Sequence, residues 1–133
     1  MAQHVLRWAH PDFKKYSWSN RGSDERQYCA PGIDLPIASI MRTKYGEYPE
    51  YHTSLDNLDL VTAEGLQGGY ELVKDCLCAI ENNRKFRVTC HGEPQLGKRG
   101  LYPDLSTKKS NILVETMMDF IAYADGTNDL IGI

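Results

Sequence analysis

Strand-like segments are few in this sequence, and their scarcity constrains the fold more than any other feature. Residues 33–41, IDLPIASIM, are a short apolar run that fits a strand buried on both faces, although Pro36 favours an edge or the start of a strand. Residues 85–89 alternate in the manner of a second strand. Because a parallel-sheet strand normally needs neighbouring strands on both sides and helices over both faces, so few strands predict an incomplete α/β fold.

Two long helices accompany these strands. Thr62 can cap a helix that runs to about residue 82, with apolar side chains recurring every three or four positions along one face. A second helix is predicted over residues 110–124, and Gly126 stands where it would stop. Residues 127–133 are typical of the cap and first turn of a further helix, so we expect a domain that continues beyond this sequence.

Composition excludes some partners. The chain has 133 residues, of which 41% are apolar and 25% charged, and its net charge of -3 gives no electrostatic reason to bind nucleic acid or an anionic membrane. Neither is expected as a partner. The amino terminus lacks the features of a signal peptide, and no stretch has the apolar length of a membrane span, so the expected location is the cytoplasm. The four cysteines have no metal-binding spacing and are interpreted as reduced thiols.

A histidine in an aromatic loop is the candidate metal ligand. Neutral imidazole binds divalent metals, so His52 can do so, and Asp56 or the hydroxyls of Thr53 and Ser54 could orient it. A single histidine is also typical of an exposed residue that makes a backbone hydrogen bond, and spacing by itself favours this second interpretation.

Asp24 and Glu25 are adjacent carboxylates between two arginines, Arg21 and Arg26. The arginines would keep both carboxylates ionised, because a nearby positive charge favours the charged form. Such a pair could bind a substrate amine or brace a metal ligand. A solvated loop held by salt bridges explains the same residues.

A long motif adds a family resemblance. Residues 21–61, RGSDERQYCAPGIDLPIASIMRTKYGEYPEYHTSLDNLDLV, resemble the hallmark segment of a bacterial family of zinc aminopeptidase-like proteins. That family is often found near polysaccharide biosynthesis genes and is distantly similar to co-catalytic zinc aminopeptidases and glutaminyl cyclases. The resemblance continues through residues 93–103, EPQLGKRGLYP, and so covers most of the chain.

The resemblance assigns roles to individual residues. It implies that His52 is a zinc ligand and that Asp24 is the acidic position beside the metal. Glu25 stands where the wider clan usually has histidine, and we expect it to face the site with Asp24 as a catalytic residue. Arg21, Arg26 and Tyr51 are the expected contacts to a substrate, which would be a peptide or an amine-bearing small molecule.

The resemblance also implies an architecture in two parts. Residues 1–106 would be the carboxyl-terminal part of a three-layer α/β/α zinc-peptidase-like core, and residues 107–133 the beginning of a truncated winged-helix domain. The family's other metal ligands would lie upstream of this segment. A co-catalytic site needs several further donors, so the chain is expected to be inactive alone.

Three functions therefore follow from the sequence. The first is a portion of a zinc-dependent aminopeptidase-like hydrolase, completed by a missing upstream segment. The second is a non-catalytic aminopeptidase-like binding module connected with polysaccharide biosynthesis. The third is a truncated gene product whose exposed apolar surface leads to self-association, in which case a homo-oligomer would be expected.

Overall fold

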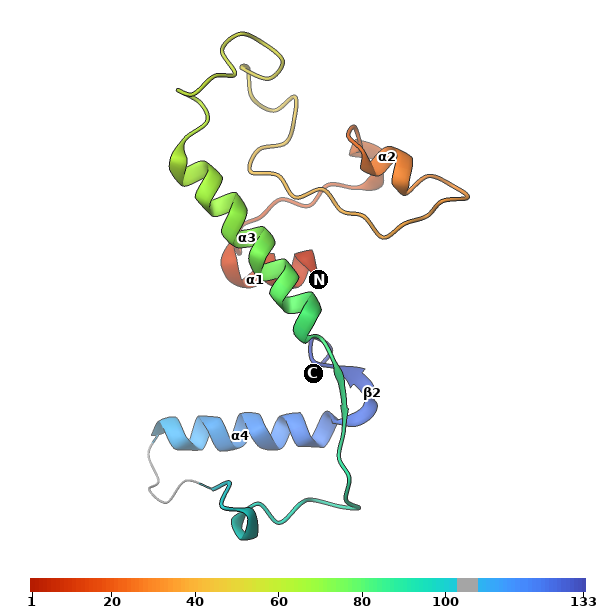
Figure 1. The fold of residues 1–133 in the computed structure, drawn as a ribbon, viewed down its shortest axis with the longest axis vertical. Helices are drawn as coiled ribbons and strands as arrows, with labels where there is room; N and C mark the ends of the chain where they lie inside the picture. Colours follow the sequence, from red (N-terminus) through yellow and green to blue (C-terminus); the bar gives the residue numbers. More distant parts are fainter. Residues whose placement is uncertain (103–107) are drawn as a thin grey trace. The chain divides into compact units, whose positions relative to one another are not determined.

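A computed structural model describes residues 1–102 and 108–133, and its chain divides into two compact units, Met1–Ile80 and Glu81–Ile133. Figure 1 shows the helices of both units and labels the strand β2 of the second unit. The predicted boundary between residues 106 and 107 lies outside the described residues. In the described part of the chain, no helix is long and apolar enough to cross a membrane.

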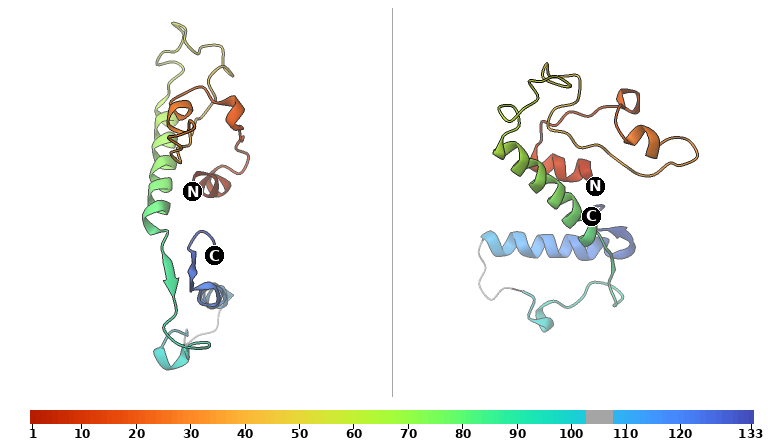
Figure 2. Two further views of the ribbon diagram at one scale, coloured as in Figure 1. Left: turned by 90° about the vertical axis from the view of Figure 1, so that its right-hand side faces the viewer. Right: turned by 45° about the horizontal axis from the view of Figure 1, so that its top comes forward.

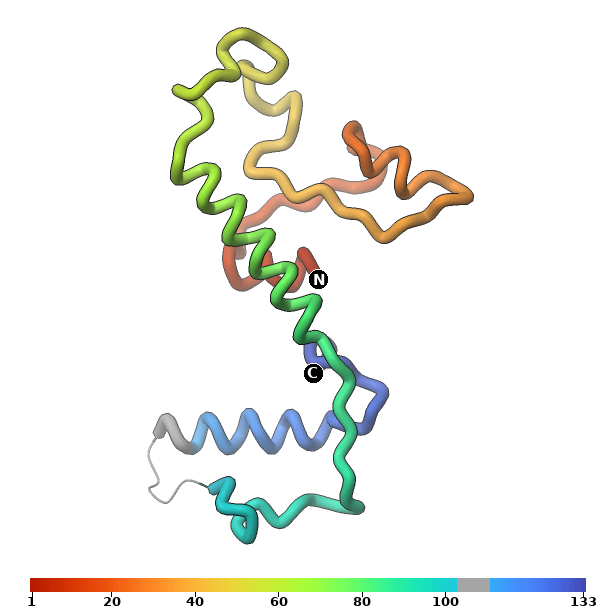
Figure 3. Tube along the Cα trace, viewed as in Figure 1, coloured from red at the N-terminus to blue at the C-terminus, as the bar shows by residue number. Residues whose placement is uncertain are grey.

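The first unit consists of helices and long connecting segments. Its elements are α1 (Ala2–Ala9), the 3-10 turn η1 (Trp18–Asn20), α2 (Glu25–Tyr28) and α3 (Ala63–Asn82), the last of which runs on into the second unit. Figure 3 follows the winding segment between α2 and α3 as a tube. The apolar side chains buried in this unit are Val5 and Cys76, so its core is small.

The prediction for α3 is confirmed. The hydroxyl oxygen of Thr62 accepts a hydrogen bond from the Gly65 amide at 3.0 Å, as an N-cap residue should, and the helix ends at Asn82. Cys76 and Cys78 lie on different sides of this helix, one buried and the other exposed, and no disulfide joins the four cysteines. The apolar face predicted from periodicity is present, but it is exposed rather than buried.

The predicted strand at residues 33–41 is wrong. The sheet of the described residues contains only β1 and β2, and residues 34–41 have no regular secondary structure. A turn closes before this segment, where the carbonyl of Ala30 accepts hydrogen bonds from the amides of Ile33 and Asp34. A buried strand needs ladder partners on both sides, and the described part of this unit provides none.

The second unit joins a helix to a two-stranded antiparallel sheet. Its elements are β1 (Lys85–Arg87), η2 (Gly97–Arg99), α4 (Lys108–Tyr123) and β2 (Asp125–Asp129), and Figure 2 shows α4 leading into β2. In the pairing of β1 with β2, Lys85 is opposite Asp129 and Arg87 is opposite Asp125. The β1 strand and the α4 helix confirm the two elements predicted in this region.

The predicted helix at residues 127–133 is wrong, because β2 occupies the beginning of this segment. Thr127 does not cap a helix; its hydroxyl and its amide both donate to the carboxylate of Asp125, at 2.7 Å. Gly126, the second residue of β2, has φ +89°, a conformation that glycine adopts without strain, where the register between β1 and β2 is irregular. A tight turn into an antiparallel strand therefore replaces the helix start.

The architecture of the described residues is thus mixed helical, with one small two-stranded sheet. The second unit has a core of its own, in which Leu96 and Ala124 are each 2% exposed. The rings of Phe86 on β1 and Phe120 on α4 meet edge to face, with centroids 5.5 Å apart. Helix and sheet of this unit are held together by apolar contact.

Candidate functional site

Glu25 organises the loop that carries the predicted acidic residues. Its Oε1 atom accepts hydrogen bonds from the amides of Gly22, at 2.9 Å, and Ser23, at 3.2 Å, while Oε2 accepts one from the hydroxyl of Ser39 at 2.8 Å. Mainly because of the two backbone donors, the pKa of Glu25 is lowered to about 2. The carboxylate is therefore ionised at neutral pH and serves as a hydrogen-bond acceptor.

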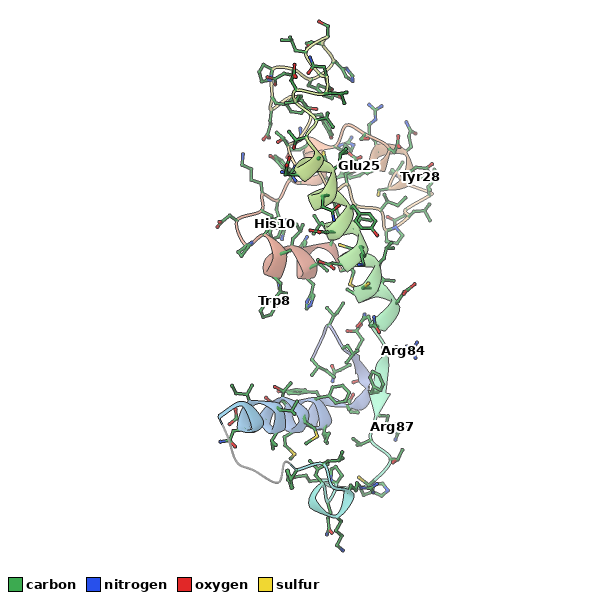
Figure 4. The ribbon with its side chains drawn as sticks, turned by 60° about the vertical axis from the view of Figure 1, so that its left-hand side comes forward. Trp8, His10, Glu25, Tyr28, Arg84 and Arg87 are labelled. Carbon is green, nitrogen blue, oxygen red and sulfur yellow. The ribbon has the colours of Figure 1, made fainter. Side chains whose placement is uncertain are left out.

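Asp24 is exposed at the N-cap position of α2, beside Glu25. Its side chain makes no capping hydrogen bond, whereas its carbonyl accepts bonds from the amides of Gln27 and Tyr28. The Asp24 carboxylate is thus on the surface, where an amine or a metal-bound group could reach it. Figure 4 labels Glu25 at the start of the same short helix.

Arg21 and Arg26 do not form the ion pairs predicted with Asp24 and Glu25, and their contact with a substrate stays a prediction. Arg21 lies over the ring of Trp18, 4.9 Å from its centroid, and donates to the Trp18 carbonyl at 3.2 Å. Arg26 is exposed. Among residues 1–102 and 111–133, whose side chains the structure describes, the ion pair found is that of Lys14 with Glu47, so backbone amides rather than arginines stabilise the Glu25 carboxylate.

Tyr45 connects the acidic loop to the histidine loop. Its hydroxyl donates to the Asn20 carbonyl at 3.1 Å and lies 3.5 Å from Oε1 of Glu25. Burial and the nearby Glu25 carboxylate raise the pKa of Tyr45, so the phenol stays protonated and can donate. Tyr45 also lies near the histidine loop, because the centroid of its ring is 6.2 Å from the ring centroid of Tyr51.

His52 completes this chain of contacts. Its imidazole stacks on the ring of Tyr51, with centroids 4.0 Å apart and planes inclined by 17°, and Tyr48 meets Tyr51 edge to face at 5.6 Å. His52 has φ +59°, which is uncommon for a residue other than glycine. The side chain is exposed.

The structure thus connects Glu25 to His52 indirectly, through Tyr45 and Tyr51, and these four residues are called the cluster below. Sequence reasoning singled out Glu25, Tyr51 and His52 but missed Tyr45 and Ser39. The signal for Tyr45 was present in the density of tyrosines around residues 45–51, which is too high for a solvated linker. Nothing in the sequence pattern marks Ser39 as the partner of Glu25.

A zinc ion at this cluster would find one strong donor, the imidazole of His52. Zinc takes about four ligands, mostly histidine, cysteine and carboxylate. No group of three or more such side chains is placed to hold a metal ion within the part of the chain that the structure describes. The described residues therefore do not make a zinc site by themselves.

An open groove adjoins the cluster in the first unit. It has a volume of about 940 Å³, and its lining includes Ser39, which bonds Glu25, and Lys44, whose ammonium lies 4.2 Å from the ring centroid of Tyr45. The pKa of Glu47 at its edge is lowered, first by the hydroxyl of Tyr16, which donates to it at 2.7 Å. The groove thus has an ordered polar rim beside the cluster.

Comparisons with known proteins agree with the division into two units. Residues 84–133 match the winged helix-turn-helix family, so the second unit is of the winged-helix class. Residues 1–83 match the family described as "Domain of unknown function (DUF4910)", and the chain belongs to that family.

One curated relative comes from Clostridium acetobutylicum and is named a polysaccharide biosynthesis protein with aminopeptidase-like domain. It is 41% identical over 114 residues, which cover 84% of this chain and 26% of the relative. The chain thus spans about a quarter of the length of the relative it matches. No solved structure matches the chain.

Proposed function

We propose that this chain is a portion of a zinc-dependent aminopeptidase-like hydrolase connected with polysaccharide biosynthesis, and that it is catalytically incomplete by itself. The observation that carries the proposal is the joining of the Glu25 loop and the His52 loop through Tyr45, within the unit that matches the family. The name of the 41% identical relative supports the aminopeptidase-like part and the link to polysaccharide biosynthesis.

His52 would supply one zinc ligand in the complete protein, and the remaining ligands would come from outside the described residues. The zinc would supply Lewis acidity when bound. Asp24, which is exposed and free of a capping bond, is suited to contact a substrate amine. Glu25 is better suited to position the loop, because its two oxygens already accept bonds from Gly22, Ser23 and Ser39.

The larger fold follows from the same proposal. Residues 35–41 and α3 would belong to a three-layer α/β/α core that the rest of the polypeptide completes. In the second unit, residues 84–133 contain seven Lys and Arg against six Asp and Glu. That balance lacks the strong positive charge of a nucleic-acid-binding surface, so a docking role within the protein is the proposed use of the winged helix.

The proposal is tested with two purified proteins, this chain and the intact Clostridium acetobutylicum relative, each assayed for zinc-dependent release of an amino-terminal residue from short peptides. We expect release by the relative, its loss after chelation, its return with zinc, and no release by the chain. Zinc-dependent turnover by the chain alone, or none by the relative, would contradict the proposal.

A second candidate function is a non-catalytic module that binds a peptide or an amine-bearing sugar. The hydrogen bonds that both oxygens of the Glu25 carboxylate accept within its own unit favour this second function. They keep the carboxylate ionised, and such a group is a poor proton carrier at neutral pH. This alternative predicts ligand binding by the intact relative that chelation does not change. Loss of binding in the variant Asp24→Asn would locate the ligand.

A further inference from the structure

The first two turns of α3 contain three glycines, Gly65, Gly68 and Gly69. After proline, glycine is the residue least favourable inside a helix, because it loses the most conformational freedom on folding. None of these three has a positive φ, so the helical backbone does not require glycine there. What a glycine at such a position offers is space for a neighbouring side chain.

The side chain of Arg42 lies against this part of the helix. Its Nη1 atom donates a hydrogen bond to the carbonyl of Gly65 at 3.3 Å. A Cβ atom at Gly68 would lie 2.8 Å from the same nitrogen, which is too close, whereas a Cβ atom at Gly69 would meet nothing within 4 Å. Gly68 therefore provides the room in which the guanidinium rests on the helix, and Gly69 does not.

Arg42 holds this position without a carboxylate partner. Among the side chains that the structure describes, the ion pair found is Lys14 with Glu47, and both of these line the open groove of about 940 Å³ together with Arg42. Lys44 lines it too, and is near enough to Glu47 to help lower the pKa of that acid without pairing with it. Beside the ion pair, the charged residues of the described lining are Arg42, Lys44 and one acid, Asp12. The balance is positive.

The same groove has apolar walls, to which Phe13, Met41 and Leu66 contribute. Small-molecule sites have volumes of about 300–1,000 Å³ and combine apolar walls with a few polar groups that fix the ligand. A guanidinium binds carboxylate and phosphate groups through parallel N–H donors. The bond to the Gly65 carbonyl uses one N–H group of Arg42 and leaves others for a ligand. The groove thus suits a molecule with an anionic group and an apolar body.

We propose that this groove binds a small organic anion, whose carboxylate or phosphate group is held by Arg42 and Lys44 and whose apolar part lies against Phe13, Met41 and Leu66. Gly68 positions the Arg42 guanidinium for this contact. The inference goes beyond the proposed function and needs no metal.

The test is titration of the isotope-labelled chain, followed by NMR, with four probes: phenyl phosphate, phenylacetate, inorganic phosphate and the uncharged 2-phenylethanol. Three variants are titrated in the same way. Arg42→Gln removes the guanidinium, Gly68→Ala places a methyl group where the guanidinium lies, and Gly69→Ala is the matched control on the same helix. Circular dichroism checks that each variant keeps its helix content, and Arg42 is exposed, so its replacement should leave the fold intact.

We expect phenyl phosphate or phenylacetate to bind more tightly than inorganic phosphate, and 2-phenylethanol not to bind. Arg42→Gln should weaken the binding roughly tenfold or more, because a hydrogen bond to a charged group is lost. Gly68→Ala should weaken it about threefold or more by displacing the guanidinium, whereas Gly69→Ala should leave it unchanged. Both alanine variants should melt no lower than the unmodified chain, since alanine favours a helix more than glycine does. A purely structural role of Gly68 would not separate binding from melting in this way.

The proposal is overturned if neither organic anion shows saturable binding or if 2-phenylethanol binds equally well. Unchanged affinity in Arg42→Gln, or the same affinity in both alanine variants, overturns it as well, and so does inorganic phosphate binding as tightly as the organic anions. The tighter of the two organic anions identifies the group that Arg42 recognises. Neither His52 nor Asp24 belongs to the described lining of the groove, so failure of the hydrolase assay and failure of anion binding are separate results.

Discussion

Shortening Leu96 to alanine should strongly destabilise the second unit. Leu96 lies just before η2 and is 2% exposed. Its carbonyl accepts hydrogen bonds from the amides of Arg99 and Leu101, which hold the loop in place. Removing a fully buried leucine side chain costs about 2–5 kcal/mol of unfolding free energy, including the cavity left behind. A unit of this size has a total stability of only about 3–8 kcal/mol. The variant should therefore lose roughly half of it.

The assay is thermal and urea denaturation of the purified chain, followed by circular dichroism. At about 4–8 °C per kcal/mol for a small domain, Leu96→Ala should lower the melting temperature of this unit by more than about 10 °C. Leu101→Ala is the matched control, since this leucine belongs to the same loop but is 51% exposed, and it should cost no more than about 1.5 kcal/mol. Equal effects of the two substitutions would refute the assignment of Leu96 to the core.

Three further predictions concern the first unit. The pKa of Glu25 is lowered from 4.5 to about 2, so its stabilising contribution is present above pH 4.5 and lost as the pH falls through about 2. Urea denaturation should therefore find Glu25→Gln less stable than wild type at pH 6. A difference in unfolding free energy that does not narrow towards pH 2 would contradict this prediction. Thr62→Ala removes the N-cap of α3 and should cost about 1 kcal/mol in the same experiment, whereas no change would mean that the cap contributes nothing. Tyr45→Phe should shift the NMR signals of the His52 ring, because the tyrosine links the two loops, and unchanged signals would show the loops to be independent.

Local signals in the sequence predicted the long helices well. The cap at Thr62 and the period of the apolar residues gave α3, and alternation gave β1. These signals report which face of an element is apolar but not what covers it, which is why the predicted inner face of α3 is exposed. The run at residues 33–41 failed as a strand for the same reason, since a strand depends on partners that a local pattern does not contain.

The candidate site was predicted only as separate pieces. Residue types and the family motif pointed to Asp24, Glu25 and His52, but the links between them are contacts between residues distant in sequence. The expected arginine pairing was wrong because the backbone amides of Gly22 and Ser23 donate hydrogen bonds to Glu25 instead. Every residue except proline has such an amide, so the residue types do not reveal which amides will donate. The catalytic roles of Asp24 and Glu25 and the zinc ligation by His52 stay predictions.

Zinc binding by the purified chain, measured by calorimetry together with its mass in solution, tests the central claim most directly. If the chain supplies one ligand to a site completed elsewhere, the monomer should show no tight one-to-one zinc binding, and His52→Ala should bind zinc like the unmodified chain. Tight stoichiometric binding by the monomer that His52→Ala abolishes would contradict the account, because it would mean that these residues complete a metal site without a partner.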